Sequence, residues 1–136
     1  MKKILFLALT FCVFQSVQSQ NTKENPSENV DNNIYNSAVI EVKPEFPGGI
    51  TAFYKFIGAN YKTPDVAGLK GKLIIAFVVD KDGSLTDIKV LRDIGFGTGT
   101  EAVRVLKLSP KWIPAVQNGK TVKCAYTLPI NIETSK

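Results

Sequence analysis

The sequence contains no histidine, and its 136 residues include only two cysteines and one tryptophan. Without histidine, the chain lacks the commonest general base and the commonest metal ligand of proteins. Cys12 lies in an N-terminal segment that we expect to be removed, which leaves Cys124 alone. A single cysteine makes neither an internal disulfide nor a thiolate metal site. These absences argue against an enzyme, and we predict no catalytic residues, no metal and no cofactor.

Charge of one sign is not concentrated anywhere along the chain. The formal net charge is +5, from 17 basic and 12 acidic residues, and the lysines are scattered without a block of five or six. Nucleic-acid binding requires a basic patch or stripe, so we predict no nucleic-acid partner. Long hydrophobic runs are also missing. The apolar run from Ile4 to Phe14 is shorter than the roughly 20 residues that span a bilayer.

Residues 1–19 have the features of a cleavable signal peptide. Lys2 and Lys3 precede the apolar run, and Val17 and Ser19 occupy the small-residue positions of a signal peptidase site, which places cleavage after Ser19. We therefore predict export, with an uncleaved inner-membrane anchor as the less favoured alternative. Residues 20–37 are rich in Asn, Glu and Ser, and their small apolar area predicts a flexible tail. The folded domain is predicted to span residues 38–134.

The domain shows the pattern of an α+β protein. Residues 39–42 suggest a short strand, and Ile50, Phe53, Ile57 and Tyr61 recur at helical spacing behind the breaker segment PEFPGG. The apolar run at 73–79, the turn signal Asp-Gly at 82–83 and the alternation at 88–90 predict a β-hairpin. A second helix follows the glycine-rich GFGTGT, and an extended segment at 112–116 and an Asn-Gly turn lead to a last strand. We predict a three-stranded antiparallel sheet with two helices packed on one face.

The second helix is expected to begin with a capping box. Thr98 and Glu101 have the required spacing, and Ala102, Val105 and Leu106 form its apolar stripe. The preceding loop resembles a dinucleotide fingerprint only in part, because Thr100 stands where the third glycine of GxGxxG belongs. The acidic segment DKDGSLTDIKVL also departs from a calcium loop, since its glycine comes early and it ends in leucine.

The last strand, TVKCAYTLPINI at 121–132, has an apolar residue at every even position. Strand side chains alternate between faces, so the even positions are predicted to face the helices, with Cys124 as a buried thiol. Successive residues also direct their backbone groups to opposite edges. Pro129 is at an odd position and has no N–H, and proline belongs at a sheet edge. The odd residues are therefore predicted to face an outer edge: Thr121, Lys123, Ala125, Thr127 and Pro129.

Two motifs follow each other in this order: PEFPGGITAFYKFI, and the segment from GKLIIAFVVDKDG to YTLPINI. On these motifs the chain resembles the C-terminal domain of the TonB energy-transducer family over about residues 39–132. The resemblance implies a periplasmic, non-enzymatic domain that takes part in energy-dependent transport. It also implies capture of the TonB box of outer-membrane transporters as an added strand beside the last strand, which is β-augmentation. The odd residues of that strand are the expected binding edge.

The sequence departs from the full transducer, which has an uncleaved N-terminal helix and a long proline-rich linker. We therefore expect an accessory or regulatory protein, with a separately anchored motor complex as a further partner. Two alternatives stay open. Lys123 and Pro129 also suit protection of an edge against aggregation, and the same edges would serve a self-associating envelope protein, a homodimer or a strand-swapped assembly.

Overall fold

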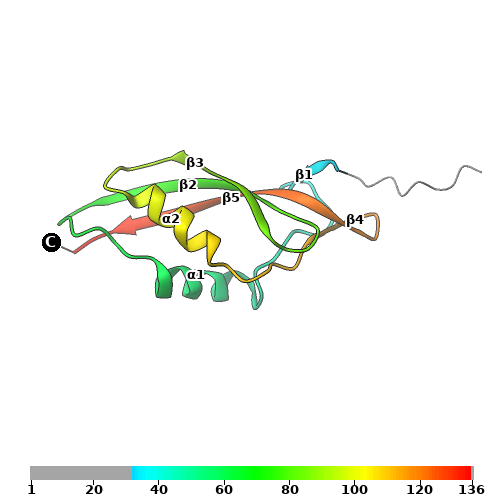
Figure 1. The fold of residues 1–136 in the computed structure, drawn as a ribbon, viewed down its shortest axis with the longest axis horizontal. Helices are drawn as coiled ribbons and strands as arrows, with labels where there is room; N and C mark the ends of the chain where they lie inside the picture. Colours follow the sequence, from blue (N-terminus) through cyan, green and yellow to red (C-terminus); the bar gives the residue numbers. More distant parts are fainter. Residues whose placement is uncertain (1–31, 136) are drawn as a thin grey trace, which may run out of the picture.

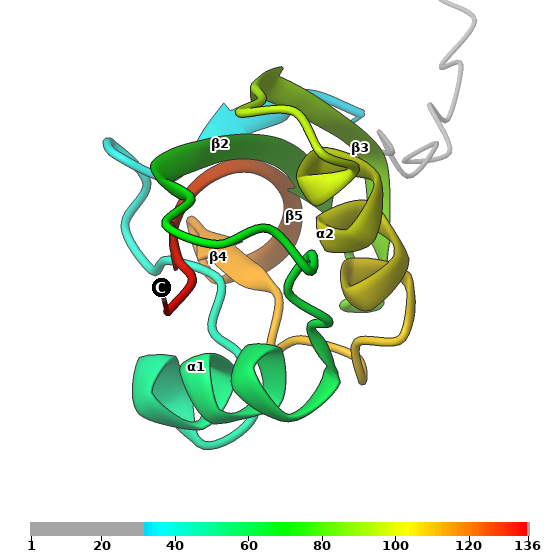
Figure 2. The same cartoon turned by 90° about the vertical axis from the view of Figure 1, so that its left-hand side faces the viewer.

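The computed structural model describes residues 32–135, which form an elongated domain (Figures 1 and 2). The predicted signal peptide and residues 20–31 of the predicted tail lie outside the described residues. The elements are, in chain order, β1 (Ile34–Asn36), α1 (Gly49–Asn60), β2 (Lys70–Val79), β3 (Leu85–Arg92), α2 (Thr98–Lys107), β4 (Ala115–Gln117) and β5 (Lys120–Glu133).

The strands form one mixed sheet in the order β1-β5-β2-β3, and β4 pairs with β5 beyond the end of β2. β2 is antiparallel to both β3 and β5, whereas β1 is parallel to β5. Figure 1 shows β1 and β4 at one end of the long strands and the C-terminus at the other. The predicted α+β class is confirmed. The sheet is larger than the predicted three strands because two short strands extend it around β5.

The main core lies between the sheet and the two helices. Alternate residues of β2 and β5 share one buried cluster with Phe53 and Ile57 of α1 and with the predicted stripe of α2. The indole of Trp112 is at the centre, with ring centroids of four neighbouring aromatic residues 5.1 to 5.9 Å away: Phe46, Phe53, Phe77 and Tyr126. Both helices therefore cover the same face. Figure 2 shows α2 next to β3 and α1 at a distance from it, below the curled strands.

The predicted even set of the last strand is inward, as expected. Val122, Cys124, Leu128, Ile130 and Ile132 are buried, and Tyr126 is partly buried. In α1, by contrast, Ile50 belongs to the predicted stripe and yet is about half exposed (51%). The first turn of this helix therefore contributes less to the core than its spacing suggested.

The predicted turn between β2 and β3 is present. Asp80 N–H donates to Ser84 O, Gly83 N–H donates to Asp80 O, and Gly83 has a φ of +86°. The carbonyl of Gly83 also accepts a 2.8 Å hydrogen bond from the N–H of Trp112. This turn thus holds the backbone beside the central tryptophan.

The predicted capping box of α2 is wrong. The N-cap is Gly97, and no side chain caps the helix. Thr98 is already helical, and its hydroxyl donates to Gly95 O (2.6 Å) and to the Asp93 carboxylate (3.1 Å). Glu101 instead accepts from Arg104 and from the backbone N–H of Lys62. Spacing alone did not reveal these competing partners.

The N-terminal part of the domain also differs from expectation. The segment predicted as a strand at 39–42 makes only an isolated bridge, Val42 to Val116, and the first strand is β1, inside the predicted tail. β1 is ordered by a second, smaller cluster of buried residues, against which Tyr35 packs: Ile40, Ala115, Val122 and Cys124. The boundary predicted at residue 38 is therefore too late, because long-range contacts supply apolar area that the tail itself lacks.

Candidate functional site

The two edges of β5 are used differently. On one edge β2 pairs in unbroken register from Val79 opposite Cys124 to Lys70 opposite Glu133. β4 continues along β5 at Lys120 to Val122. Val116 of β4 exchanges both backbone hydrogen bonds with Val42, so Thr121, opposite Val116, directs its own backbone groups away from β4. The even residues of β5 thus pair within the domain.

The odd residues of β5 face the outer edge, as the position of Pro129 predicted. The carbonyl of Ala125 accepts a 3.1 Å hydrogen bond from the N–H of Ser37, on the side opposite β2. The register of β5 with β2 has no shift, so the same direction holds for Thr127 and Pro129. The structure therefore brings the five predicted edge residues together along one flank.

The outer edge is not open over its whole length, and here the prediction is corrected. β1 pairs with it in parallel, with Ile34 opposite Lys123 and Asn36 opposite Ala125. The physical reason is the second cluster, which holds the chain just before and after residue 40 against this end of β5. Lys123 and Ala125 are accordingly only partly exposed, whereas Thr127 and Pro129 are exposed.

The remaining part of the edge borders a groove. Within residues 32–135, no strand pairs with the outer flank of β5 from Thr127 to Glu133. A mostly apolar hollow of about 370 Å³ lies beside this stretch, between α1 and the paired strands β5 and β2, and is lined by Tyr54, Ile57, Gly58, Lys72, Pro129, Ile130 and Asn131. Tyr54 is half exposed (50%). This place combines unpaired strand backbone with an apolar recess.

Sequence reasoning missed the contribution of α1 to this groove. Tyr54 lies outside the stripe formed by Phe53 and Ile57, so periodicity assigned it to the solvent. The available signal was the pairing of an exposed aromatic residue with a glycine one turn later. Gly58 has open space around it, with no atom within 4 Å of an added Cβ, and so leaves the recess unfilled.

The chemistry near the edge suits contact more than reaction. Burial raises the pKa of the Cys124 thiol, which keeps it protonated and weakly nucleophilic. Burial, and to a smaller extent Tyr54, raises the pKa of Tyr126. Residues 32–135 contain no group of three His, Cys, Asp or Glu side chains placed to hold a metal ion. In the same range, none of the helices has the length and apolar content needed to cross a membrane.

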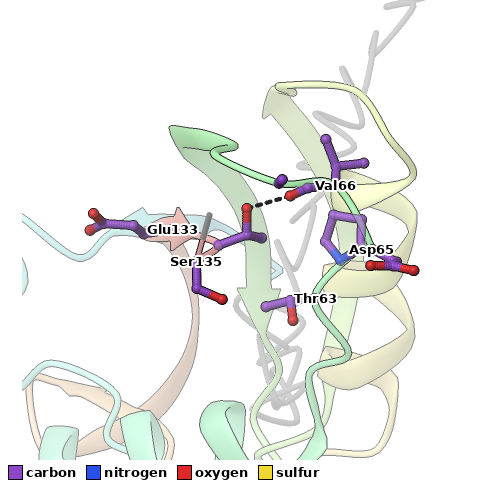
Figure 3. A pocket seen from close by; sticks show the side chains of 8 residues that line it. Thr63, Asp65, Val66, Glu133 and Ser135 are labelled. Atoms are coloured by element: carbon purple, nitrogen blue, oxygen red, sulfur yellow. Dashed lines mark hydrogen bonds between the residues drawn. The ribbon is translucent and has the colours of Figure 1, made fainter.

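A larger hollow lies elsewhere, at the C-terminal end of β5. It measures about 710 Å³ and is formed by residues 63–67 and 133–135. Thr134 bridges the two segments by donating its hydroxyl to the carbonyl of Val66 at 2.5 Å. Figure 3 shows the carboxylates of Asp65 and Glu133 pointing in opposite directions, away from each other. The acids therefore do not converge on a common ligand.

The glycine-rich loop before α2 is also occupied by its own contacts. The Asp93 carboxylate accepts hydrogen bonds from the N–H of Gly95 and from Thr98, and these, with the Gly95 bond the largest cause, lower its pKa. A Cβ on Gly99 would lie 2.3 Å from the Asp93 carboxylate. The glycines therefore serve the turn and leave no cradle for a phosphate.

Comparison with known proteins gives one family match. The family model described as the Gram-negative bacterial TonB protein C-terminal matches residues 65–133, about half of the chain. Two solution NMR structures of the Helicobacter pylori TonB C-terminal domain, of different lengths, are similar to this chain. They are 25% and 26% identical, cover 64% and 62% of this chain and 81% and 91% of theirs, and have TM-scores of 0.44 and 0.43.

The solution NMR structure of the Pseudomonas aeruginosa TonB C-terminal domain is 21% identical. It matches over 56% of this chain and 85% of its own length, with a TM-score of 0.37. No curated protein shows a significant match to the chain.

Proposed function

Because the chain belongs to the family of the C-terminal domain of the Gram-negative bacterial TonB protein, we propose that it binds an extended segment of an outer-membrane transporter by strand addition. The segment is the TonB box, and the binding edge is the outer flank of β5. The protein acts in the periplasm after export, as an accessory or regulator of energy-dependent transport. A separately anchored motor complex would supply the energy.

The observation that carries this proposal is the unpaired flank of β5 beside an apolar groove. The backbone groups of Thr127 and Asn131 face outward, and the hollow lined by Tyr54 and Gly58 adjoins the part of this flank at Pro129 and Asn131. In strand addition, backbone hydrogen bonds give affinity and side-chain recesses give specificity. A guest strand would pair with the outer flank of β5 and place a small or apolar side chain in the hollow.

Pro129 sets the limit of such pairing. It offers a carbonyl but no N–H to the outer edge, so each guest strand has one hydrogen bond fewer at this position. Each typical intramolecular hydrogen bond contributes a net of about 0.5–1.5 kcal/mol. Affinity therefore depends on a short row of outward donors, and loss of one of them has a measurable effect.

The test follows backbone amide signals by NMR while short synthetic peptides from transporter N-termini are added. We expect shifts along β5 and in the segment around Tyr54 and Gly58 of α1. The substitution Thr127→Pro removes one outward N–H and leaves the pairing with β2 intact, so it should weaken binding about three- to tenfold. Thr127→Val keeps the N–H and serves as the matched control.

Two results would oppose the proposal. The first is an absence of shifts along residues 123–131 for every peptide tested. The second is equal affinity of the Thr127→Pro and Thr127→Val variants, because binding would then not use the outer backbone groups. A concentration-dependent dimer that persists with saturating peptide would favour the self-association alternative instead.

A further inference from the structure

We propose that β1 is a built-in competitor for the partner strand: it occupies the outer edge at Lys123 and Ala125 and must leave before a guest strand can pair there. This inference rests on the proposed function and adds to it a regulation of the same site. It concerns the described segment 34–37 of this chain, which the structure shows seated on the edge.

β1 occupies the edge as a guest strand would. It is extended, it runs parallel to β5, and the N–H of Ser37 donates to the carbonyl of Ala125. Tyr35 lies opposite Cys124 and packs against the second cluster, while Ile34 remains half exposed (54%). The domain therefore contains one example of the pairing that the proposed function assigns to a foreign segment.

The pairing of β1 is short compared with that of β2 on the other edge of β5. β1 pairs over three residues, whereas β2 pairs with β5 over ten. Immediately after β1 the chain turns, with Val39 N–H donating to Asn36 O and Ala38 N–H to the Asn36 side chain. Short edge segments with few buried contacts are drawn from the low-stability end of a structure. Release of β1 would leave the sheet of β2, β3 and β5 intact.

The anchor of β1 lies just beyond this turn. Ile40 is buried in the second cluster, and the Glu41 carboxylate accepts hydrogen bonds from the N–H of Asn118 and the side-chain amide of Gln117. A released β1 would thus stay tethered within a few residues of the edge. A short tether gives a high effective concentration, so β1 competes continually with a guest in solution.

Competition follows from the order of outward donors along β5. Lys123, Ala125 and Thr127 direct their N–H groups outward in succession, and Pro129 interrupts the row. A guest confined to the part that β1 leaves open has Thr127 and then the gap at Pro129. A guest that displaces β1 gains the two donors at Lys123 and Ala125. The continuous part of the binding edge is therefore the part that β1 covers.

The size of the effect follows from the population of the released state. The apparent dissociation constant of a guest equals its intrinsic value divided by the fraction of molecules with β1 released. If β1 is released in about one molecule in ten, removal of β1 raises guest affinity about tenfold. Locking β1 in place should abolish the shifts at Lys123 and Ala125.

The lock needs one new cysteine. Tyr35 and Cys124 are opposite residues of neighbouring strands and both contact the second cluster, and the strand spacing lies within the Cα separations of disulfides. Tyr35→Cys in the full chain, with Cys12→Ser to avoid other pairings, is oxidised to join β1 to β5. The same sample after reduction is its own control. Binding of the transporter N-terminal peptides is measured in both states.

The release variant is Ser37→Pro, which removes the N–H that donates to Ala125, and Ser37→Ala is its matched control. We expect about three- to tenfold tighter peptide binding for Ser37→Pro than for Ser37→Ala. We expect binding at least tenfold weaker in the oxidised lock than after reduction. Native-state hydrogen exchange gives a readout without peptide: the Ser37 amide should exchange by local opening, much faster than the amides shared by β2 and β5.

The outcomes separate this inference from the proposed function. Peptide binding that is equal in the oxidised and reduced lock overturns the competition and leaves strand addition standing. Ser37 exchange as slow as that of the core amides also overturns it, because β1 would then leave only on global unfolding. If no peptide binds to any variant, including Ser37→Pro, the proposed function fails, and competition at the edge fails with it.

Discussion

Replacing Gly83 with alanine tests the contact that fixes Trp112 at the centre of the core. Gly83 has a φ of +86°, and a Cβ added there would lie 2.0 Å from the carbonyl oxygen of Trp112. The obstacle is a backbone atom, so no change of rotamer relieves it. The two segments must separate, and the 2.8 Å hydrogen bond from Trp112 N–H to Gly83 O must lengthen or break.

Two costs add in this variant. A non-glycine residue in the left-handed conformation costs about 1–2 kcal/mol, and leaving a buried backbone group without its hydrogen bond costs about 1–3 kcal/mol. We therefore expect Gly83→Ala to lower the free energy of unfolding by about 3 kcal/mol. That is a large share of the roughly 5–15 kcal/mol typical of a domain. Displacement of Trp112 would also loosen the packing of its aromatic neighbours, so about 3 kcal/mol is the minimum loss that we expect.

Gly119→Ala is the matched control for this experiment. Gly119 also lies in a hairpin turn and has a φ of +73°, but no atom lies within 4 Å of an added Cβ. Its cost should be limited to the conformational strain, about 1–2 kcal/mol. Urea unfolding followed by tryptophan fluorescence compares the two variants. With a slope of about 1.5 kcal/mol/M, the midpoint of Gly83→Ala should fall by about 2 M, and equal midpoints of the two variants would refute the clash.

Three further variants test other parts of the structure. Phe77→Ala removes a buried ring that contacts Trp112 and Tyr126 and should lower the free energy of unfolding by about 3–5 kcal/mol in the same urea assay; a loss below about 1.5 kcal/mol would contradict the core described. Hydrogen bonding to Arg104, with further contributions from the Lys62 N–H and from both charges, lowers the pKa of Glu101 from 4.5 to about 2. The stabilisation of the fold by the Glu101 carboxylate is therefore complete above pH 4.5 and is lost as the pH falls through 2. Between these pH values the urea midpoint should change less in Glu101→Gln than in the unmodified protein. An equal change of the midpoint with pH in the two proteins would oppose this assignment. Burial, with smaller effects of Glu101 and Asp93, raises the pKa of Tyr61 to about 12, so the contribution of Tyr61 to the free energy of unfolding is present below pH 10 and is lost toward pH 12. Tyr61→Phe should lower the free energy of unfolding by about 1 kcal/mol at pH 7 and reduce its decline at alkaline pH. Urea unfolding at pH 7 and above pH 10 checks both effects.

The long elements could be predicted because their signals are local and repeated. β5 shows six apolar residues at alternate positions, and α2 shows a stripe of three inward residues in one sequence window. Each repeat adds to the same assignment, so a single exception does not overturn it. Ile50 is such an exception, since it is half exposed while Phe53 and Ile57 of the same stripe are buried.

Features that depend on one or two residues were predicted less well. Thr98 and Glu101 have the spacing of a capping box, but Asp93 and Gly95 take the Thr98 hydroxyl, and Arg104 takes Glu101. These partners compete with the helix terminus for the same polar groups. β1 has only three residues, which is too short for a periodic pattern, and its order comes from contacts with residues about 90 positions away.

The proposed binding edge combines a part that can be predicted from the sequence and a part that cannot. The residues that face this edge follow from local geometry, because successive residues direct their backbone groups to opposite edges. Pro129 has no N–H and therefore faces the edge at which no pairing within the domain requires one. The occupancy of this edge follows from the balance between β1, anchored by Ile40 and Glu41, and any other strand that reaches the flank. A local rule thus determines where a strand can be added, whereas the free energy of the β1 pairing determines when. Under the proposed function, changes that weaken β1 should therefore alter peptide affinity without altering a single residue of β5.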